Sequence, residues 1–252
     1  MADVTSSGAT SAAAMPDLSG SPALILDLDG TVHPGTVGAE VLRELVQTGN
    51  ASQEAASTAL AAISGRADPS ASFYATVETV YSQYAAAIDG IPHHALKNAA
   101  RFAWRTCRRT VFEFAWPVVS AAAQSGYTTV IISGSPLEAV SEASLDLEIS
   151  HYYGTQVEVT DGHCRARLER APGHAGGKRG CLDELNERLT LDLGRSLAIG
   201  NSVSDIEILT AVGYPITFEA DADLAALARA RDWPMVDRET ALRACMSVIS
   251  PK

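Results

Sequence analysis

The sequence predicts an α/β fold, in which a doubly wound parallel-sheet core carries a helical cap domain inserted after the first strand. Three short apolar runs, at residues 23–26, 127–132 and 196–199, each end in a loop of small polar residues, which is typical of strands buried on both faces. Helical patterns separate these strands, and such alternation favours a parallel sheet with helices on both faces. A ligand site is therefore expected beyond the carboxyl ends of the strands, where the three polar loops fall.

The remaining core elements follow from the same patterns. A fourth apolar run, at residues 214–218, extends the sheet. Residues 154–168 alternate and turn at Asp161-Gly162, which indicates a β-hairpin. Helical periodicity and breaker residues indicate core helices at residues 116–124, 136–145, 180–189, 205–212, 221–230 and 239–249.

The cap is predicted from a segment without any strand pattern, residues 35–110. Breaks at Gly49-Asn50, at Gly65-Arg66 with Pro69, and at Gly90 with Pro92 divide it into four helices near 36–48, 52–64, 69–88 and 92–109. We therefore expect a core formed by residues 21–34 and 111–252 and a helical cap at 35–110. Residues 1–20 are expected to form a disordered tail, because they contain too little apolar surface to offset the entropy of ordering.

The composition of the 252-residue chain excludes several classes of protein. No apolar run approaches the roughly 20 residues of a membrane span, so no membrane association is expected. A formal net charge of −11 repels nucleic acid. The four cysteines form no CxxC pair, and the N-terminus lacks the positive charge and apolar stretch of a secretion signal. We therefore expect reduced thiols and a cytoplasmic location.

Two carboxylates, Asp27 and Asp29, follow the first strand within one short loop. Acids this close must differ in role or be neutralised by a cation. A hard cation such as Mg²⁺ takes one or two carboxylates plus phosphate oxygens, and a carboxylate left free could shuttle a proton. Because Asp also commonly caps turns and helices, the pair alone does not distinguish a catalytic site from a pair of caps.

Further polar residues follow the other strands. Ser133 lies where a hydroxyl and the N–H groups of a helix start can hold a phosphate oxygen. Lys178, in a glycine-rich approach to a helix, offers a compact cation for phosphate, and its neighbour Arg179 is a rival for that place. Asn201 and Asp205 lie four residues apart after the third strand, so they share one side if the loop winds directly into a helix.

This ordered set resembles the haloacid dehalogenase-like (HAD-like) hydrolases, which have a Rossmann-type core, and within them the phosphoserine-phosphatase-like branch with a helical cap. The likeness spans about residues 23–212, and its first motif is specific. The four motifs read Asp27-Leu28-Asp29-Gly30-Thr31, then Ser133-Gly134, then Lys178, then Gly200-Asn201 with Asp205.

The resemblance implies a Mg²⁺-dependent phosphatase that hydrolyses a small phosphorylated metabolite through an aspartyl-phosphate intermediate. Asp27 would attack phosphorus, Asp29 would act as acid and then as base, and Lys178 would be the catalytic cation. The phosphate-binding residues implied are Thr31, Ser133, Gly134 and Lys178, and the metal ligands implied are Asp27, Asp29, Asn201 and Asp205. Members that displace halide lack the second acid, so Asp29 favours a phosphatase over a dehalogenase.

The sequence departs from the family pattern in two places. An acidic metal ligand usually begins the fourth motif, so either the uncharged Asn201 ligates weakly or Asp205 takes more of the metal's charge, directly or through water. Phosphoserine phosphatases resemble one another in carrying a Glu about nine residues after the nucleophile, where this chain has Thr36, with Glu40 four residues further on. Phosphoserine is therefore not the favoured substrate. Two other functions stay open: a phosphotransferase or phosphomutase of the same fold, and a non-catalytic phosphate-ligand-binding protein.

The predicted cap contains two further patterns. Basic residues at spacings of four would lie on one face of the helix at 92–109, either to meet a second anionic group of the substrate or to form a solvated face paired with acids: Lys97, Arg101, Arg105 and Arg109. Aromatic residues at helical spacing, including Phe73, Tyr81 and Tyr84, are expected to form the small core of the cap, with one or two lining a pocket.

Overall fold

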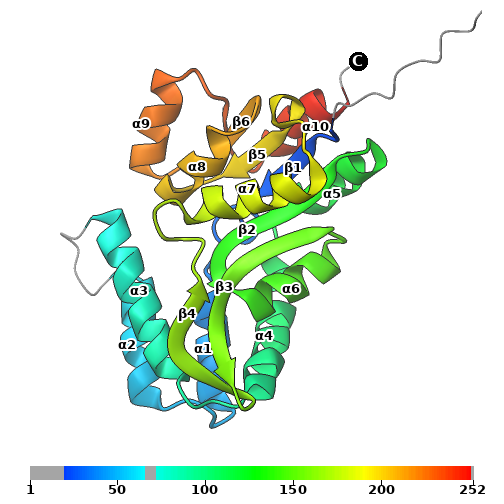
Figure 1. The fold of residues 1–252 in the computed structure, drawn as a ribbon. Helices are drawn as coiled ribbons and strands as arrows, with labels where there is room; N and C mark the ends of the chain where they lie inside the picture. The colour runs from blue at the N-terminus through cyan, green and yellow to red at the C-terminus, as the bar shows by residue number, and fades with distance from the viewer. Residues whose placement is uncertain (1–19, 66–71, 251–252) are drawn as a thin grey trace, which may run out of the picture.

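A seven-stranded sheet forms the centre of the molecule in the computed structural model, which describes residues 20–65 and 72–250 (Figure 1). The strand order is β4-β3-β2-β1-β5-β6-β7, and all neighbours are parallel except β3 and β4. The strands are β1 (Ala23–Leu26), β2 (Thr128–Pro136), β3 (His151–Thr160), β4 (His163–Arg170), β5 (Leu197–Gly200), β6 (Tyr214–Phe218) and β7 (Met235–Val236). Except for Gly20, the expected tail lies outside the described residues, as do Arg66 and Pro69.

Ten α-helices lie within the described ranges: α1 (Val37–Gln47), α2 (Gln53–Ile63), α3 (Phe73–Ile88), α4 (His93–Cys107), α5 (Ala115–Gln124), α6 (Leu137–Asp146), α7 (Gly177–Leu189), α8 (Ile206–Leu209), α9 (Ala222–Ala230) and α10 (Ala241–Ile249). The helix predicted at 205–212 is wrong in extent. Residues 203–205 form a 3-10 turn, and α8 has only four residues. The Asp205 side chain accepts hydrogen bonds from the preceding loop and caps it, so the α-helix begins only after Asp205.

Alternating residues of the strands supply two separate hydrophobic cores, one on each face of the sheet. Leu24 and Leu26 of β1 pack with α5, α6 and α10. Ala23 and Ile25 point to the other face and pack with α7, α8 and α9. The predicted doubly wound α/β architecture is therefore confirmed.

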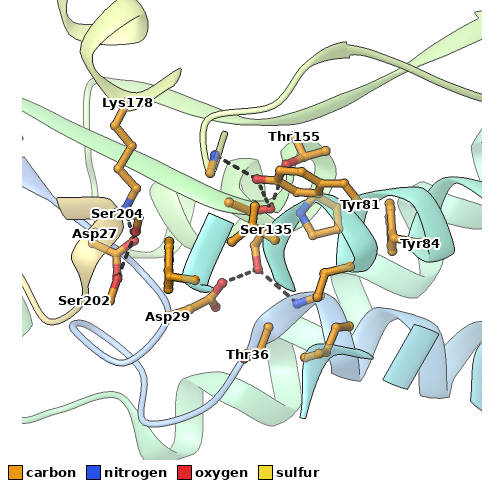
Figure 2. A pocket seen from close by; sticks show the side chains of 18 residues that line it. Asp27, Asp29, Thr36, Tyr81, Tyr84, Ser135, Thr155, Lys178, Ser202 and Ser204 are labelled. Carbon is orange, nitrogen blue, oxygen red and sulfur yellow. Dashed lines mark hydrogen bonds and ion pairs between the residues drawn. The ribbon is translucent and has the colours of Figure 1, made fainter. Parts of the chain in front are cut away.

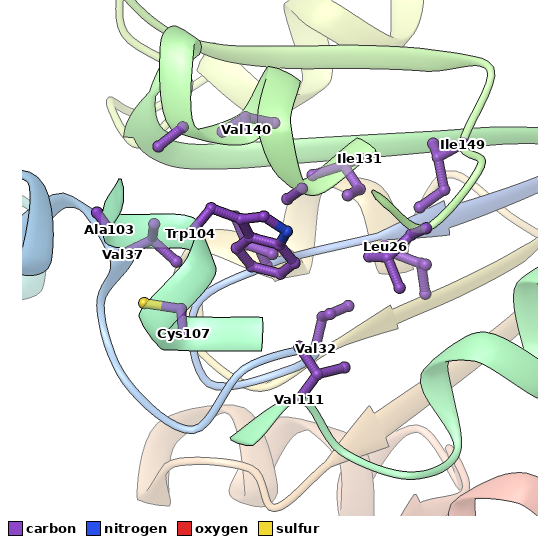
Figure 3. Packing of buried hydrophobic residues seen from close by; sticks show 14 of the residues in the cluster. Leu26, Val32, Val37, Ala103, Trp104, Cys107, Val111, Ile131, Val140 and Ile149 are labelled. Atoms are coloured by element: carbon purple, nitrogen blue, oxygen red, sulfur yellow. The ribbon is translucent and has the colours of Figure 1, made fainter. Parts of the chain in front are cut away.

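Helices α1 and α4 join the first of these cores. Figure 3 shows Trp104 of α4 among apolar residues from the strands and from other helices, including Leu26, Ile131 and Val140. Trp104 is 3% exposed, and its indole N–H donates to Asp146 Oδ2 over 3.3 Å. Helices α1 and α4 thus pack directly against the sheet, while α2 and α3 pack against each other.

The hairpin of β3 and β4 connects the sheet to the helical segment. Residues 151–153 of β3 pair in parallel with β2, and its later residues pair with β4 in antiparallel fashion. The strand β4 hydrogen-bonds the turn before α4, since Gly90 N donates to Cys164 O and Cys164 N donates to Ile91 O, over 2.9 and 2.8 Å. The predicted hairpin is present and longer than expected, and its strand β4 packs against α3 (Figure 1).

Two expectations from composition concern the cysteines and membrane-spanning helices. The four cysteines are buried and form no disulfide: Cys107, Cys164, Cys181 and Cys245. Within the two described ranges no helix combines the length and apolar character that crossing a membrane requires.

Candidate active site

The loop after β1 places Asp27 and Asp29 at the carboxyl edge of the sheet. Asp27 N donates to Ile199 O over 3.1 Å, so the start of the loop still follows β5. The chain then turns sharply at Gly30, which has a φ of +87°. A Cβ atom at Gly30 would overlap the side-chain amide of Asn201. Glycine is therefore required here both by its positive φ and by the close approach of the fourth-motif loop.

Lys178 joins two carboxylates beneath this loop. Its Nζ lies 2.6 Å from Asp27 Oδ1 and 2.5 Å from Asp205 Oδ1, and the side chain is almost fully buried at 1% exposure. The neighbouring Arg179 is exposed and pairs with Asp183 over 2.8 Å. The structure thus places Lys178, and not its rival, beside the first-motif carboxylate.

The site contains more negative than positive charge. Burial and the nearby Asp205 carboxylate together raise the pKa of Asp27 to about 7, against the opposing effect of Lys178. Although burial lowers the pKa of Lys178, the two carboxylates hold it above its ordinary value, so the ammonium stays charged. Because three acids surround this single cation, the arrangement favours a further cation or a proton.

Asp29 is held by the start of α1 and by a serine of β2. Its Oδ1 accepts from Val37 N over 2.8 Å, and its Oδ2 accepts from Ser135 Oγ over 2.6 Å. Ser135 Oγ in turn accepts from Gly38 N over 3.0 Å. Burial raises the pKa of Asp29, and the hydrogen bonds from Ser135 and Val37 partly offset that effect. Sequence reasoning did not single out Ser135, although it follows directly on the second motif.

The fourth motif forms a compact loop around Asp205. Asp205 Oδ2 accepts from Asn201 N and Ser202 N over 2.8 and 2.9 Å, while Oδ1 bonds to Lys178. Asn201 Oδ1 accepts from Thr31 Oγ1 over 3.2 Å. Both oxygens of Asp205 are therefore engaged with protein groups, whereas Asn201 faces the first-motif loop.

A cavity of about 240 Å³ opens above these residues. Of the residues predicted from the sequence, Asp27, Asp29, Gly134 and Lys178 line it. The other four do not line it: Ser133 and Asp205 hydrogen-bond to lining residues, whereas Thr31 and Asn201 hydrogen-bond to each other. Ser133 Oγ accepts from Ser135 N over 3.0 Å, which leaves its own hydroxyl proton free to be donated.

The far wall of the cavity comes from the helical segment (Figure 2). Figure 2 shows Lys178 and Asp27 on one side and Tyr81 and Tyr84 on the other, with Asp29 and Ser135 between them. Apolar and aromatic side chains of α2 and α3 form this wall: Ile63, Phe73, Val77, Val80, Tyr81 and Tyr84. The expected cap aromatics thus line the cavity more than the sequence indicated.

Two candidate substrate contacts from the sequence lie elsewhere. Glu40 forms an ion pair with Arg43 on α1 and does not line the cavity. The basic face of α4 is exposed and turned toward acids of α6, since Arg101 pairs with Glu142 over 3.5 Å. Of the described residues that line the cavity, none comes from α4.

A metal at this site would need uncharged oxygens as well as carboxylates. Within the described residues no three side chains of His, Cys, Asp or Glu are arranged as a metal cluster. Asp27 Oδ2 takes part in no hydrogen bond among the described residues. A carboxylate oxygen available for ligation beside an amide oxygen is a donor set that suits a hard dication.

Comparison with known proteins agrees with this fold. The model of the haloacid dehalogenase-like hydrolase family matches residues 24–210, so the chain belongs to this family. Among curated proteins, phosphoserine phosphatase SerB1 of Mycobacterium tuberculosis is 31% identical over 120 residues, which cover 48% of this chain and 39% of that protein. The matched segment thus spans well under half of the relative's length.

Solved structures share the fold at lower sequence identity. A protein of unknown function from Bordetella pertussis Tohama I superposes with a TM-score of 0.71 and 22% identity, covering 87% of this chain and all of that one. A substrate-bound phosphoserine phosphatase superposes with a TM-score of 0.62 and 20% identity, covering 88% of this chain and 97% of that one. These likenesses support the α/β architecture with its inserted helices.

Proposed function

We propose that this protein is a Mg²⁺-dependent phosphatase that hydrolyses a small phosphomonoester through an aspartyl-phosphate on Asp27. The observation that carries the proposal is the buried Lys178 ammonium, which lies 2.6 Å from Asp27 Oδ1 at the floor of a cavity that also contains Asp29. A nucleophile, a cation for the transferred group and an acid–base are thereby gathered at one point.

Asp27 is suited to be the nucleophile because its two carboxylate oxygens have different environments. Oδ1 is fixed by Lys178, while Oδ2 is free of hydrogen bonds among the described residues. In the first step an Asp27 oxygen forms a bond to phosphorus and the ester oxygen leaves. Lys178 would neutralise charge on the phosphoryl oxygens, and such preset charges are usually the largest catalytic contribution.

Asp29 is suited to be the acid and then the base. Burial raises the pKa of Asp29, which favours the protonated form that a general acid needs. It would give its proton to the leaving alkoxide and later accept a proton from the water that attacks phosphorus. The second step releases inorganic phosphate and restores the Asp27 carboxylate.

The remaining site residues divide between the metal and the phosphate. Mg²⁺ would be held by Asp27, the Asn201 side-chain oxygen and the Asp29 main-chain carbonyl, where it supplies positive charge to the phosphate oxygens. Asp205 is assigned to positioning Lys178, because it is fully buried, does not line the cavity and bonds to protein groups through both carboxylate oxygens. Gly134 would contact phosphate directly and the free Ser133 proton would be donated to it, while Thr31 holds Asn201.

Two broader expectations belong to the same proposal. Residues 35–110 act as a cap that supplies the substrate-facing wall, and a small phosphorylated metabolite is the partner. A cytoplasmic location is supported by four buried cysteines without a disulfide, which suits a reducing compartment.

Release of inorganic phosphate from a panel of phosphorylated metabolites tests the function. We expect turnover with Mg²⁺, none in excess chelator, and a loss of at least about 100-fold in Asp27→Asn, since an amide cannot accept the phosphoryl group. The exposed Asp183→Asn variant is the matched control and should keep the parent rate. Retention of more than about a hundredth of the activity in Asp27→Asn would refute the assignment.

A further inference from the structure

Among the described residues that line the cavity, charged side chains lie at one end. The charged residues among its described lining are Asp27, Asp29 and Lys178, all at the end assigned to the phosphate. The opposite wall consists of the aliphatic and aromatic side chains of α2 and α3 (Figure 2). The nearby acid of α3, Glu78, pairs with His174 over 2.9 Å, is largely exposed and does not line the cavity.

Three polar side chains between these two ends are already engaged by the protein. The Tyr81 hydroxyl accepts from Gly173 N over 2.8 Å and donates to Gly134 O over 3.4 Å. Thr155 Oγ1 donates to Gly134 O over 2.7 Å, and Ser135 Oγ donates to Asp29. Tyr81 therefore presents its ring to the cavity, held in place by its hydroxyl. The hydroxyl of the lining residue Tyr84 is buried without a hydrogen-bond partner among the described residues, so the polar groups that remain on this wall are uncharged.

From this distribution we infer that the substrate is a phosphomonoester whose alcohol part is small, uncharged and largely apolar; the inference rests on the proposed function. A phosphate seated at Lys178 places the next few atoms of its ester chain against Val77, Val80 and Tyr81. An ammonium or carboxylate group there would lose water without gaining a charged partner from the described part of the wall, which is strongly unfavourable. A methyl or methylene group would instead gain from burial.

The size of the cavity limits the alcohol further. Its volume of about 240 Å³ lies below the roughly 300–1,000 Å³ typical of pockets for drug-sized ligands. The phosphate itself occupies part of that space. A short alkyl group or a single ring fits the remainder.

Two esters of nearly equal shape test the inference. Propyl phosphate and 2-aminoethyl phosphate differ only in the exchange of a terminal methyl group for an ammonium group, and O-phosphoserine carries both an ammonium and a carboxylate. We expect kcat/KM for propyl phosphate to exceed that for 2-aminoethyl phosphate about tenfold or more, with O-phosphoserine no better than 2-aminoethyl phosphate. The readout is inorganic phosphate release with Mg²⁺, with Asp27→Asn as the blank.

A charge added to the apolar wall should reverse this preference. Val77→Asp places a carboxylate on the lining face of α3, and the ratio should then shift toward 2-aminoethyl phosphate by about tenfold or more. Thr79→Asp makes a carboxylate on the exposed side of the same helix and should leave the ratio unchanged. Thermal unfolding of both variants checks that the helix is intact.

The outcomes separate the two proposals. If the enzyme hydrolyses O-phosphoserine or 2-aminoethyl phosphate as well as propyl phosphate, or if Val77→Asp leaves the ratio unaltered, the apolar-substrate inference is overturned while the phosphatase function stands. If none of the three esters nor any metabolite of the wider panel is hydrolysed, the proposed function falls and the inference with it.

Discussion

Ser135 Oγ donates a hydrogen bond to Asp29 Oδ2 over 2.6 Å, although the two residues are 106 positions apart in the chain. The bond fixes the carboxyl group that we assign as acid and base. It also joins the end of β2 to the loop after β1, since Asp29 is held from its other side by Val37 N of α1. Three segments of the chain therefore determine the orientation of one catalytic group.

Ser135→Ala should lower kcat by about 10- to 100-fold, because a hydrogen bond to a charged group contributes about 1.5–3 kcal/mol. KM should change little, since Asp29 is assigned to proton transfer and not to binding. Steady-state kinetics on any ester that the protein hydrolyses provide the measurement. Ser144→Ala is the control, because Ser144 is also buried but its hydroxyl has no hydrogen-bond partner among the described residues. Equal rates in the two variants would remove Ser135 from the mechanism.

Lys178 and Arg179 form a matched pair of adjacent cations with opposite environments. Lys178→Gln leaves Asp27 and Asp205 without their shared ammonium, so activity should fall about 100-fold or more. The thermal midpoint should fall as well, because breaking a buried ion pair costs about 3–5 kcal/mol. Arg179→Gln removes only an exposed pair and should leave both quantities nearly unchanged. A larger loss of activity in Arg179→Gln would reverse the assignment.

Gly30→Ala should disrupt the site more than it disrupts the fold. The added Cβ must displace the Asn201 amide, and the positive φ adds strain of about 1–3 kcal/mol. Gly126→Ala shares the positive φ but has open space around the new atom, so it isolates the backbone effect. We expect similar thermal midpoints for the two variants and a loss of kcat/KM in Gly30→Ala alone. Undiminished kcat/KM in Gly30→Ala would show that the Asn201 position is irrelevant to turnover.

Asn201→Asp should lower the Mg²⁺ concentration that gives half-maximal rate, because it adds a negative charge to a ligand position. Titration of the initial rate with Mg²⁺ measures the change. Asn98→Asp, an exposed substitution on α4, makes the same change in charge and so controls for the effect of net charge on Mg²⁺ binding. An unchanged or higher requirement in Asn201→Asp would place Asn201 away from the metal.

Much of the core could be predicted from the sequence because its strands are continuous apolar runs, and a run such as Ala23–Leu26 has few alternatives to a buried strand. Lengths were harder to predict. The strand β2 continues through Ser133 to Pro136 with a register shift after Ile132, which no local pattern indicates. The position of Ser135 beside Asp29 depends on that irregularity, so the residue could not be singled out. The strand β7 has only two residues, too few to show any periodicity.

The motif residues could be predicted, but their partners could not. Whether Lys178 or Arg179 enters the site depends on how α7 begins after Gly176, which has a φ of 78°. The hydrogen bonds that Asp205 accepts from main-chain N–H groups form only because the loop before α8 folds back toward its carboxylate. The cavity wall depends on the placement of α3 against the hairpin, a tertiary contact that amphipathic spacing alone does not specify.

The most direct test of the central claim is chemical trapping of the phosphorylated residue. The protein is mixed with a phosphate ester that it hydrolyses, and the mixture is quenched in acid and reduced with borohydride. The peptides of the protein are then analysed by mass spectrometry. The mechanism predicts that the Asp27 carboxyl group is converted to an alcohol only when the ester is present, and that Asp27→Asn shows no conversion. Substrate-dependent conversion of a different residue would contradict the assignment of Asp27 as the nucleophile.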